Sequence, residues 1–123
     1  MKTNLSPQEI ITLHIRSDEL IDSAIINGDY KTNNREHKKR AQLFQILSKD
    51  IELAKEVYGH LLIHHCITTK ISSASECLRL NIYVDKAVEI LEEISNRTDI
   101  GVRRTNAEMV LRVWRGEFPG KTL

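Results

Sequence analysis

Two histidines in this sequence have the spacing of metal ligands. His60 and His64 are four residues apart, so on a helix they would share one face, where two imidazoles can bind a metal ion. Leu61 stands where the metalloprotease motif H-E-x-x-H has its glutamate. His65 and Cys66 add donor atoms, but we expect them on other faces or in the following turn. We therefore expect two histidines at the edge of the core, with no metal ion and no other cofactor.

The two cysteines and the glycines do not form a recognisable catalytic motif. Cys66 and Cys77 are eleven residues apart, which is the spacing of neither a redox C-x-x-C pair nor a zinc knuckle. We expect reduced thiols packed as small apolar groups, as in a cytoplasmic protein. The five glycines are scattered along the chain, so a glycine-rich phosphate loop is absent from the sequence, and so is a nucleophile motif. We expect a protein that is not an enzyme.

Acidic residues form two groups that could supply paired carboxylates. General acid–base catalysis needs a cleft that raises the pKa of one carboxyl group of the pair. We instead expect these side chains on the outer faces of helices, in contact with water. They are Asp18, Glu19, Asp22, Glu89, Glu92 and Glu93.

A basic segment covers residues 31–49. It holds six cations and one acid, Glu36, a local charge of +5 within a chain whose net charge is only +1. Such a patch could bind phosphates, attract an acidic protein or be a solvated helix face. Tyr30 is the one aromatic residue expected among the cations, so the stacking platform of single-strand binders is missing. The cations are Lys31, Arg35, Lys38, Lys39, Arg40 and Lys49.

Composition indicates the elements that must position these residues. The 123 residues fit one domain, and only five are glycine and two proline. An all-β fold needs a turn every ~8–12 residues, which so few turn-formers cannot supply. The sequence therefore predicts an all-α protein, and none of its apolar stretches approaches the ~20 residues of a membrane span.

Periodicity predicts six helices. The first has a capping box in Ser6-Pro7-Gln8-Glu9 and ends at Gly28. A polar loop is expected over residues 29–34, with Asn34 as the cap of a second helix. That helix should bury four residues at helical spacing. They are His37, Ala41, Phe44 and Leu47.

The last predicted helix carries a possible contact site. We expect Asp99 to cap it, and Gly116 and Pro119 to end it. Met109 and Trp114 lie near its end, either at the edge of the core or, in an open-ended array, in an exposed apolar patch for a partner or a second copy.

An internal repeat of 33 residues links the central helices. Shifting the chain by 33 positions places apolar residues of 51–78 on apolar residues of 84–111 without an insertion. Ala54 falls on Ala87 and Ala74 on Ala107, and the first pair of helices matches loosely through Ile21 and Ala41. Such a period is typical of stacked helical hairpins.

Several motifs resemble those of a known family. These are Gly28-Asp29-Tyr30, Asn33-Asn34-x-x-His37, Asp99-x-x-Val102-Arg103 and Val102-Arg103-x-x-x-Ala107. Over residues 7–114 the chain resembles small bacterial HEAT-like proteins catalogued as a domain of unknown function. The resemblance implies a helical-repeat scaffold that presents a surface to a partner. Some such proteins resemble immunity proteins that neutralise the toxin of an adjacent gene.

We therefore predict a single domain, a short right-handed HEAT-like α-solenoid. Its three hairpins would span residues 7–48, 50–81 and 83–115, followed by a tail over 116–123. The second helix of each hairpin would line one broad surface. Its predicted partner-binding residues are Arg35, Lys38, Lys39, Ser73, Glu76, Arg79, Arg103, Asn106 and Arg112.

These observations predict a non-catalytic protein-binding module, most specifically an immunity-type protein that binds and neutralises a toxin. The alternative is a nucleic-acid-binding HEAT-like domain that acts through residues 31–49. We expect a protein partner, with nucleic acid second and no membrane, and a cytoplasmic monomer or weak dimer.

Overall fold

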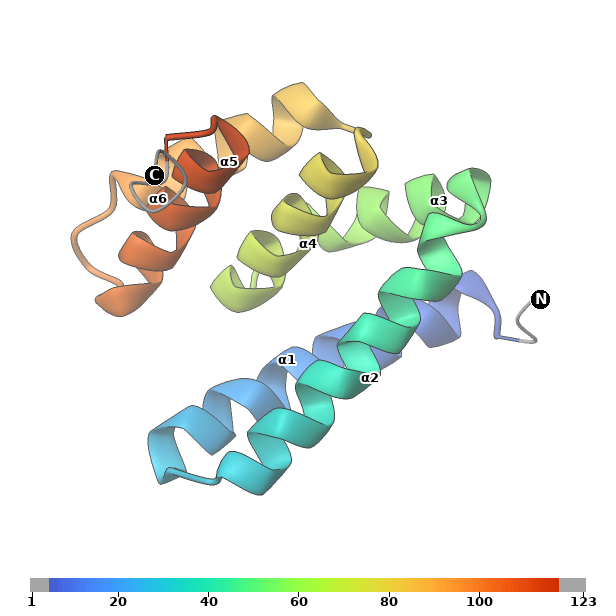
Figure 1. Cartoon of the computed structure of the whole chain (residues 1–123), viewed down its shortest axis with the longest axis horizontal. Helices are drawn as coiled ribbons and strands as arrows, with labels where there is room; N and C mark the ends of the chain where they lie inside the picture. Colours follow the sequence, from blue (N-terminus) through green and yellow to red (C-terminus); the bar gives the residue numbers. More distant parts are fainter. Residues whose placement is uncertain (1–4, 118–123) are drawn as a thin grey trace. The chain divides into compact units, whose positions relative to one another are not determined.

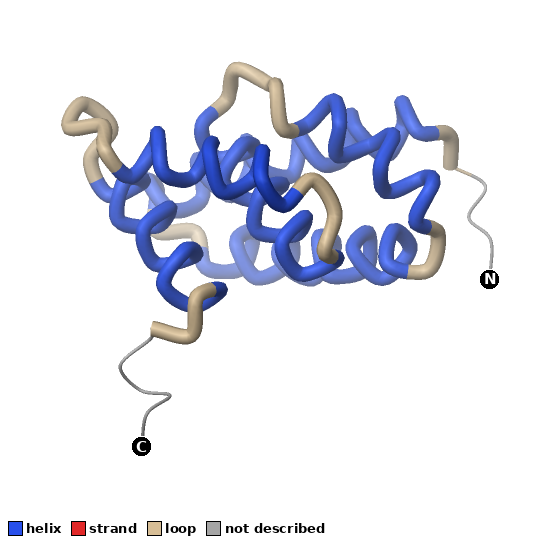
Figure 2. The backbone as a smooth tube through the Cα atoms, turned by 90° about the horizontal axis from the view of Figure 1, so that it is seen from above, coloured by secondary structure: helices blue, strands red, loops and turns tan. Residues whose placement is uncertain are grey.

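Six helices account for all regular structure in residues 5–117, the part of the chain that the computed structural model describes (Figures 1 and 2). The prediction of an all-α fold is confirmed. No helix in this range is long and apolar enough to cross a bilayer. The helices are α1 (Pro7–Asn27), α2 (Tyr30–Ser48), α3 (Ile51–Leu61), α4 (Ile67–Leu80), α5 (Val84–Ser95) and α6 (Val102–Trp114).

The chain divides into two compact units. The first unit ends at Ile63 and the second begins at His64. In the first, α1 packs along α2 and both contact α3. In the second, α5 packs against α4 and α6, which also contact each other. The boundary falls inside the predicted hairpin of residues 50–81, and a stack of three hairpins in one solenoid remains a prediction that fits the order of the helices.

The ends of α1 follow the predicted capping signals. The Ser6 hydroxyl accepts a hydrogen bond from the Glu9 N–H at 3.1 Å, and the Glu9 carboxylate accepts one from the Ser6 N–H at 2.9 Å. At the other end, Gly28 takes a left-handed conformation with φ of 68°, and the Asp29 N–H returns to the Ala24 carbonyl at 2.8 Å. Both the capping box and the glycine stop are confirmed.

The second helix begins earlier than predicted. Asp29 is its N-cap, and its carboxylate accepts hydrogen bonds from the N–H and the hydroxyl of Thr32 at 3.1 and 2.6 Å. The predicted loop over residues 29–34 is therefore wrong, and Asn34 lies inside the helix rather than capping it. The aspartate directly after Gly28 favours the start of a new helix, because its side chain satisfies one backbone donor of the first turn, the Thr32 N–H.

The buried face of α2 is also shifted from the prediction. His37 and Ala41 are exposed, whereas Glu36 and Arg40 are buried together with Leu43 and Leu47. The physical reason is a set of polar contacts between α1 and α2. Arg40 donates a hydrogen bond to the Asp18 carboxylate, and the Ser17 hydroxyl donates one to the Glu36 carbonyl oxygen at 3.4 Å.

Asp18 itself contradicts the expectation of a solvated acidic face on α1. Its side chain is 1% exposed, and the His14 Nδ1 lies 3.2 Å from its second carboxylate oxygen. The imidazole of His14, in turn, packs edge-on against the Tyr58 ring of α3 with 6.4 Å between centroids. The core of the first unit therefore contains a polar cluster that joins its three helices.

The predicted repeat of 33 residues recurs in the register of α3 and α5 and in the burial of most of its apolar pairs, whereas α4 and α6 begin 35 positions apart. The first residues of α3 and α5, Ile51 and Val84, are 33 positions apart. In the loosely matched first pair, Ile21 is buried but Ala41 is exposed. Elsewhere, both members of six apolar pairs are buried. The pairs are Ala54 and Ala87, Val57 and Ile90, Tyr58 and Leu91, Leu61 and Ile94, Ala74 and Ala107, and Leu78 and Leu111.

The start of α6 differs from the prediction. Gly101 is its N-cap, and no side chain caps it. Asp99 instead accepts two hydrogen bonds from the Arg97 guanidinium, at 3.0 and 2.7 Å, because an arginine two residues away offers a paired donor for the same carboxylate. The helix ends at Trp114, with Gly116 in a left-handed conformation shortly after it. Pro119, the second predicted stop, lies outside the described residues.

Candidate partner-binding groove

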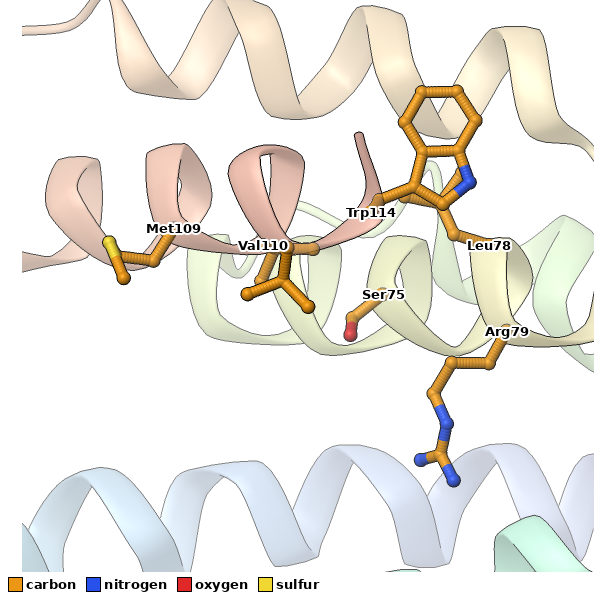
Figure 3. Close-up of a pocket in the computed structure, with 7 residues that line it drawn as sticks. Ser75, Leu78, Arg79, Met109, Val110 and Trp114 are labelled. Carbon is orange, nitrogen blue, oxygen red and sulfur yellow. The ribbon is translucent and has the colours of Figure 1, made fainter. Parts of the chain in front are cut away.

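A mostly apolar groove lies between α4 and α6 in the second unit. Its cavity volume is about 320 Å³. Side chains of α6 form one wall and those of α4 the other (Figure 3). The α6 residues are Met109, Val110, Val113 and Trp114, and the α4 residues are Ser75, Leu78 and Arg79.

Helical geometry explains why these residues share the groove. Ala107 and Leu111 of α6 are buried, which fixes the rotation of that helix. Met109 and Val113 are four residues apart, as are Val110 and Trp114, so each pair extends along the helix beside the buried stripe. On α4, Ser75 and Arg79 are also four residues apart.

The groove leaves large apolar side chains open to solvent. Val113 is 47% exposed and Trp114 is 44% exposed. Of the two readings of Trp114 in the sequence, an exposed apolar patch is the one that matches this exposure. Tryptophan is enriched among the residues that dominate protein interfaces, because it combines a large apolar surface with one polar N–H group.

A charged group marks one end of the groove. Arg79 contributes to the lining from the end of α4, and its guanidinium extends away from the Trp114 indole (Figure 3). Ser75 lies below Val110 in the same view. The site thus offers apolar surface with an arginine at its edge, and it brings together none of the residue pairs that general acid–base catalysis requires.

The structure distributes the predicted partner-binding residues over both units. Arg35, Lys38 and Lys39 lie in the first unit and the other six in the second. Only Arg79 lines the groove. Ser73 is a correction, because it is fully buried and its hydroxyl donates to the Thr69 carbonyl at 2.7 Å. The other predicted residues of the second unit are exposed or half-buried. They are Glu76, Arg103, Asn106 and Arg112.

Half of the cations in the basic segment 31–49 are engaged by acids. Arg40 is buried against Asp18. Arg35 and Lys39 both hold the Glu36 carboxylate, at 3.2 and 3.3 Å. The remaining cations make no ion pair with a described residue. They are Lys31, Lys38 and Lys49.

The histidines do not have the arrangement that the metal hypothesis needs. α3 ends at Leu61, so His64 lies beyond the helix that carries His60. The His64 ring stacks on His65 with 4.3 Å between centroids, and its Nδ1 accepts a hydrogen bond from the Cys66 N–H at 3.1 Å. In the described part of the chain, no three potential ligands gather into a metal site.

A second cavity of about 400 Å³ lies between α1 and α2. Leucines and Ile46 line it together with the buried Glu36. Burial opposes ionisation of this carboxyl, but the hydrogen bonds from Arg35 and Lys39 outweigh it and lower the pKa of Glu36. Because Arg35 and Lys39 already hold the Glu36 carboxylate, that part of the polar lining of this cavity serves the packing of α1 on α2.

Sequence reasoning identified Met109, Trp114 and Arg79 but not the groove that they share. Leu78 and Val110 have the apolar character of core residues, and nothing in the sequence distinguishes Val113 from its neighbours. One signal was present, since Val102, Met109 and Val113 form a second apolar stripe on α6, separate from Ala107 and Leu111.

Comparisons with known proteins add no relative. No family model matches the chain, and neither a curated protein nor a solved structure matches it. The resemblance to HEAT-like proteins therefore remains a prediction.

Proposed function

We propose that this chain is a non-catalytic protein-binding module that receives its partner in the groove between α4 and α6. The observation that carries the proposal is the exposure of Trp114 and Val113 along an apolar groove. Apolar surface of this kind, with polar residues at its margin, is typical of protein interaction sites.

The buried charged side chains of the first unit contact charged neighbours rather than solvent, and this supports a non-catalytic role. His14 and Arg40 both contact Asp18 in the core of the first unit, and Glu36 is held by two cations. Each is at most 8% exposed, so a substrate in solution could reach none of them without local opening. Their role is to fix α2 on α1.

Within this class, we propose an immunity-type protein that neutralises a toxin. The support is the family resemblance in the sequence together with a groove that could cover part of another protein. The partner would then be encoded by a neighbouring gene. Co-expression with that gene product should rescue cell growth when the chain is intact, and growth arrest despite co-expression would contradict this role.

A matched pair of variants tests the groove itself. Val113→Asp places a charge in the groove, whereas Thr105→Asp places one on the same helix at an exposed residue that does not line the groove and lies off its apolar stripe. The tagged wild-type chain captures partners from extract, and each identified partner is purified and measured by calorimetry. We expect Val113→Asp to weaken binding by about 10–100-fold and Thr105→Asp to leave it nearly unchanged.

The same measurement can reject the proposal. Equal affinity of the two variants for the purified partner would show that the groove is not the binding site. Circular dichroism and urea unfolding of both variants confirm that each is folded, so that a loss of binding is not a loss of structure. A gel-shift assay at low salt with short duplex and single strands tests the nucleic-acid alternative.

A further inference from the structure

We infer that the cavity between α1 and α2 is a binding site for a fatty-acid-like carboxylate, a small molecule with one anionic head and an apolar tail. The cavity lies in the first unit, whereas the groove of the proposed function lies in the second. The inference therefore goes beyond that function and does not depend on it. It follows from the size of the cavity, from the order of polar and apolar residues along it and from one arginine in its lining.

The cavity has the size and the apolar surface of a small-molecule site. Its volume of about 400 Å³ falls within the range of about 300–1,000 Å³ that is typical of ligand pockets. Four leucines and Ile46 form its apolar part, and one of them, Leu13, is 43% exposed. From Leu13 to Leu20, α1 rises about 10 Å, which is comparable to the length of a medium-chain alkyl group.

Polar and apolar residues take different positions along the cavity. α1 and α2 run antiparallel (Figure 1), and the Ser17 hydroxyl donates to the Glu36 carbonyl oxygen at 3.4 Å, so these two residues lie at the same level. Residues that precede Ser17 in α1 therefore lie opposite residues that follow Glu36 in α2. Leu13, Leu43 and Ile46 thus form an apolar patch to one side of this contact. An amphipathic molecule would place its tail over the patch and its head near the polar contact.

Arg16 supplies a cation for the head group. It lines the cavity from α1, directly before Ser17, and it is exposed. Within residues 5–117 it makes no hydrogen bond and no ion pair. The other charged residues of the lining, Lys39 and Glu36, pair with each other, so Arg16 leaves the lining with an unbalanced charge of +1. A single carboxylate complements that charge, and the arginine fork binds it through paired N–H donors.

Decanoate and decyltrimethylammonium test the inference, because they have the same alkyl chain and opposite head charges. Each is titrated into the full chain in a calorimeter, at concentrations below those at which it forms micelles. We expect one decanoate to bind per chain, and decyltrimethylammonium to bind about tenfold or more weakly. Acetate, which has the head group without the alkyl chain, should show no binding.

Two matched pairs of variants locate the site. Arg16→Gln should weaken decanoate about tenfold, whereas Lys31→Gln removes an exposed cation outside the lining and should leave the affinity unchanged. Leu13→Asn should weaken decanoate by a similar factor, whereas Ile26→Asn, at a residue of α1 that is 79% exposed and outside the lining, should not. Circular dichroism shows whether each variant is folded, and the exposed Arg16 tests the site even where Leu13→Asn does not fold.

Several results would overturn the inference. Absence of decanoate binding, equal affinity for the two alkyl probes, or equal affinity of Arg16→Gln and the wild type would each exclude an anionic ligand at Arg16. A shift of the Trp114 emission on adding decanoate would place the ligand in the groove between α4 and α6, which that residue lines. A dimer in sedimentation that Leu13→Asn dissolves would make a second copy the occupant. The binding of the natural partner to Val113→Asp is measured separately, so either proposal can fail without the other.

Discussion

Arg40 of α2 donates a hydrogen bond from its guanidinium to the carboxylate of Asp18 on α1, and both side chains are buried. The two residues are 22 positions apart, so the pair fixes the rotation and register of one helix against the other. A buried charge without a partner costs several kcal/mol. The alignment of α1 and α2 is therefore set by a specific polar contact as well as by apolar packing.

Breaking this pair should be far more costly than replacing it. We expect Arg40→Met and Asp18→Leu each to lower the free energy of unfolding by about 3–5 kcal/mol, because each leaves the opposite charge buried. The double variant should lose less than the sum of the two, with a coupling energy of about 1–3 kcal/mol. Urea unfolding at pH 7 measures all four proteins, and strictly additive losses would contradict the coupling.

The same pair explains why the buried face of α2 was predicted incorrectly. Apolar periodicity selected His37, Ala41, Phe44 and Leu47, of which only Leu47 is fully buried and Phe44 is half-buried. A residue such as Arg40 reads as a surface position in any hydropathy pattern. Its burial depends on an aspartate on another helix, and pairing between distant residues is not contained in local periodicity.

Glu36 should make the protein lose stability in acid. Burial opposes ionisation of this carboxyl, but hydrogen bonds from Arg35 and Lys39 lower its pKa below the ordinary value of 4.5. The contribution is thus fully present above about pH 4.5 and is lost as the pH falls through the lower pKa of the folded state, because the unfolded chain binds the proton more readily.

The measurement is the free energy of unfolding in urea between about pH 7 and pH 3. Glu36→Gln should be less stable than the wild type at pH 7 and should lose less stability toward acid. Glu19→Gln, which removes an exposed carboxylate from α1, serves as the control. Parallel pH profiles for Glu36→Gln and the wild type would refute this role of Glu36.

Cys77 should be unreactive in the folded protein. It is fully buried, and burial together with the nearby Glu76 carboxylate raises the pKa of its thiol to about 12. At pH 8 only about one molecule in ten thousand would carry the reactive thiolate. In a Cys66→Ser background, a disulfide reagent should modify no thiol before unfolding and one thiol in urea. Rapid modification of the native variant would contradict the burial of Cys77.

Predictions from the sequence were correct where the signal lies within one segment of the chain or in a regular spacing. The capping box of Ser6 and Glu9, the stop at Gly28 and the repeat of 33 residues all depend on residues close in sequence or on regular spacing. The groove could not be predicted in the same way. Its lining residues Leu78 and Val110 come from α4 and α6, two helices that are separated in the sequence by α5. Whether such residues are core or groove depends on how closely α4 and α6 pack.

Gly28 offers a test of backbone strain at a single site. Its φ of 68° is left-handed, and no described atom lies within 4 Å of the position that a Cβ would take. Gly28→Ala should therefore destabilise the protein through its backbone alone, by about 1–2 kcal/mol. Gly28→Asn is the matched control, since asparagine tolerates this conformation better, and it should cost clearly less. Thermal unfolding of the three proteins at one pH decides the matter, and equal losses for alanine and asparagine would point to a steric cause instead.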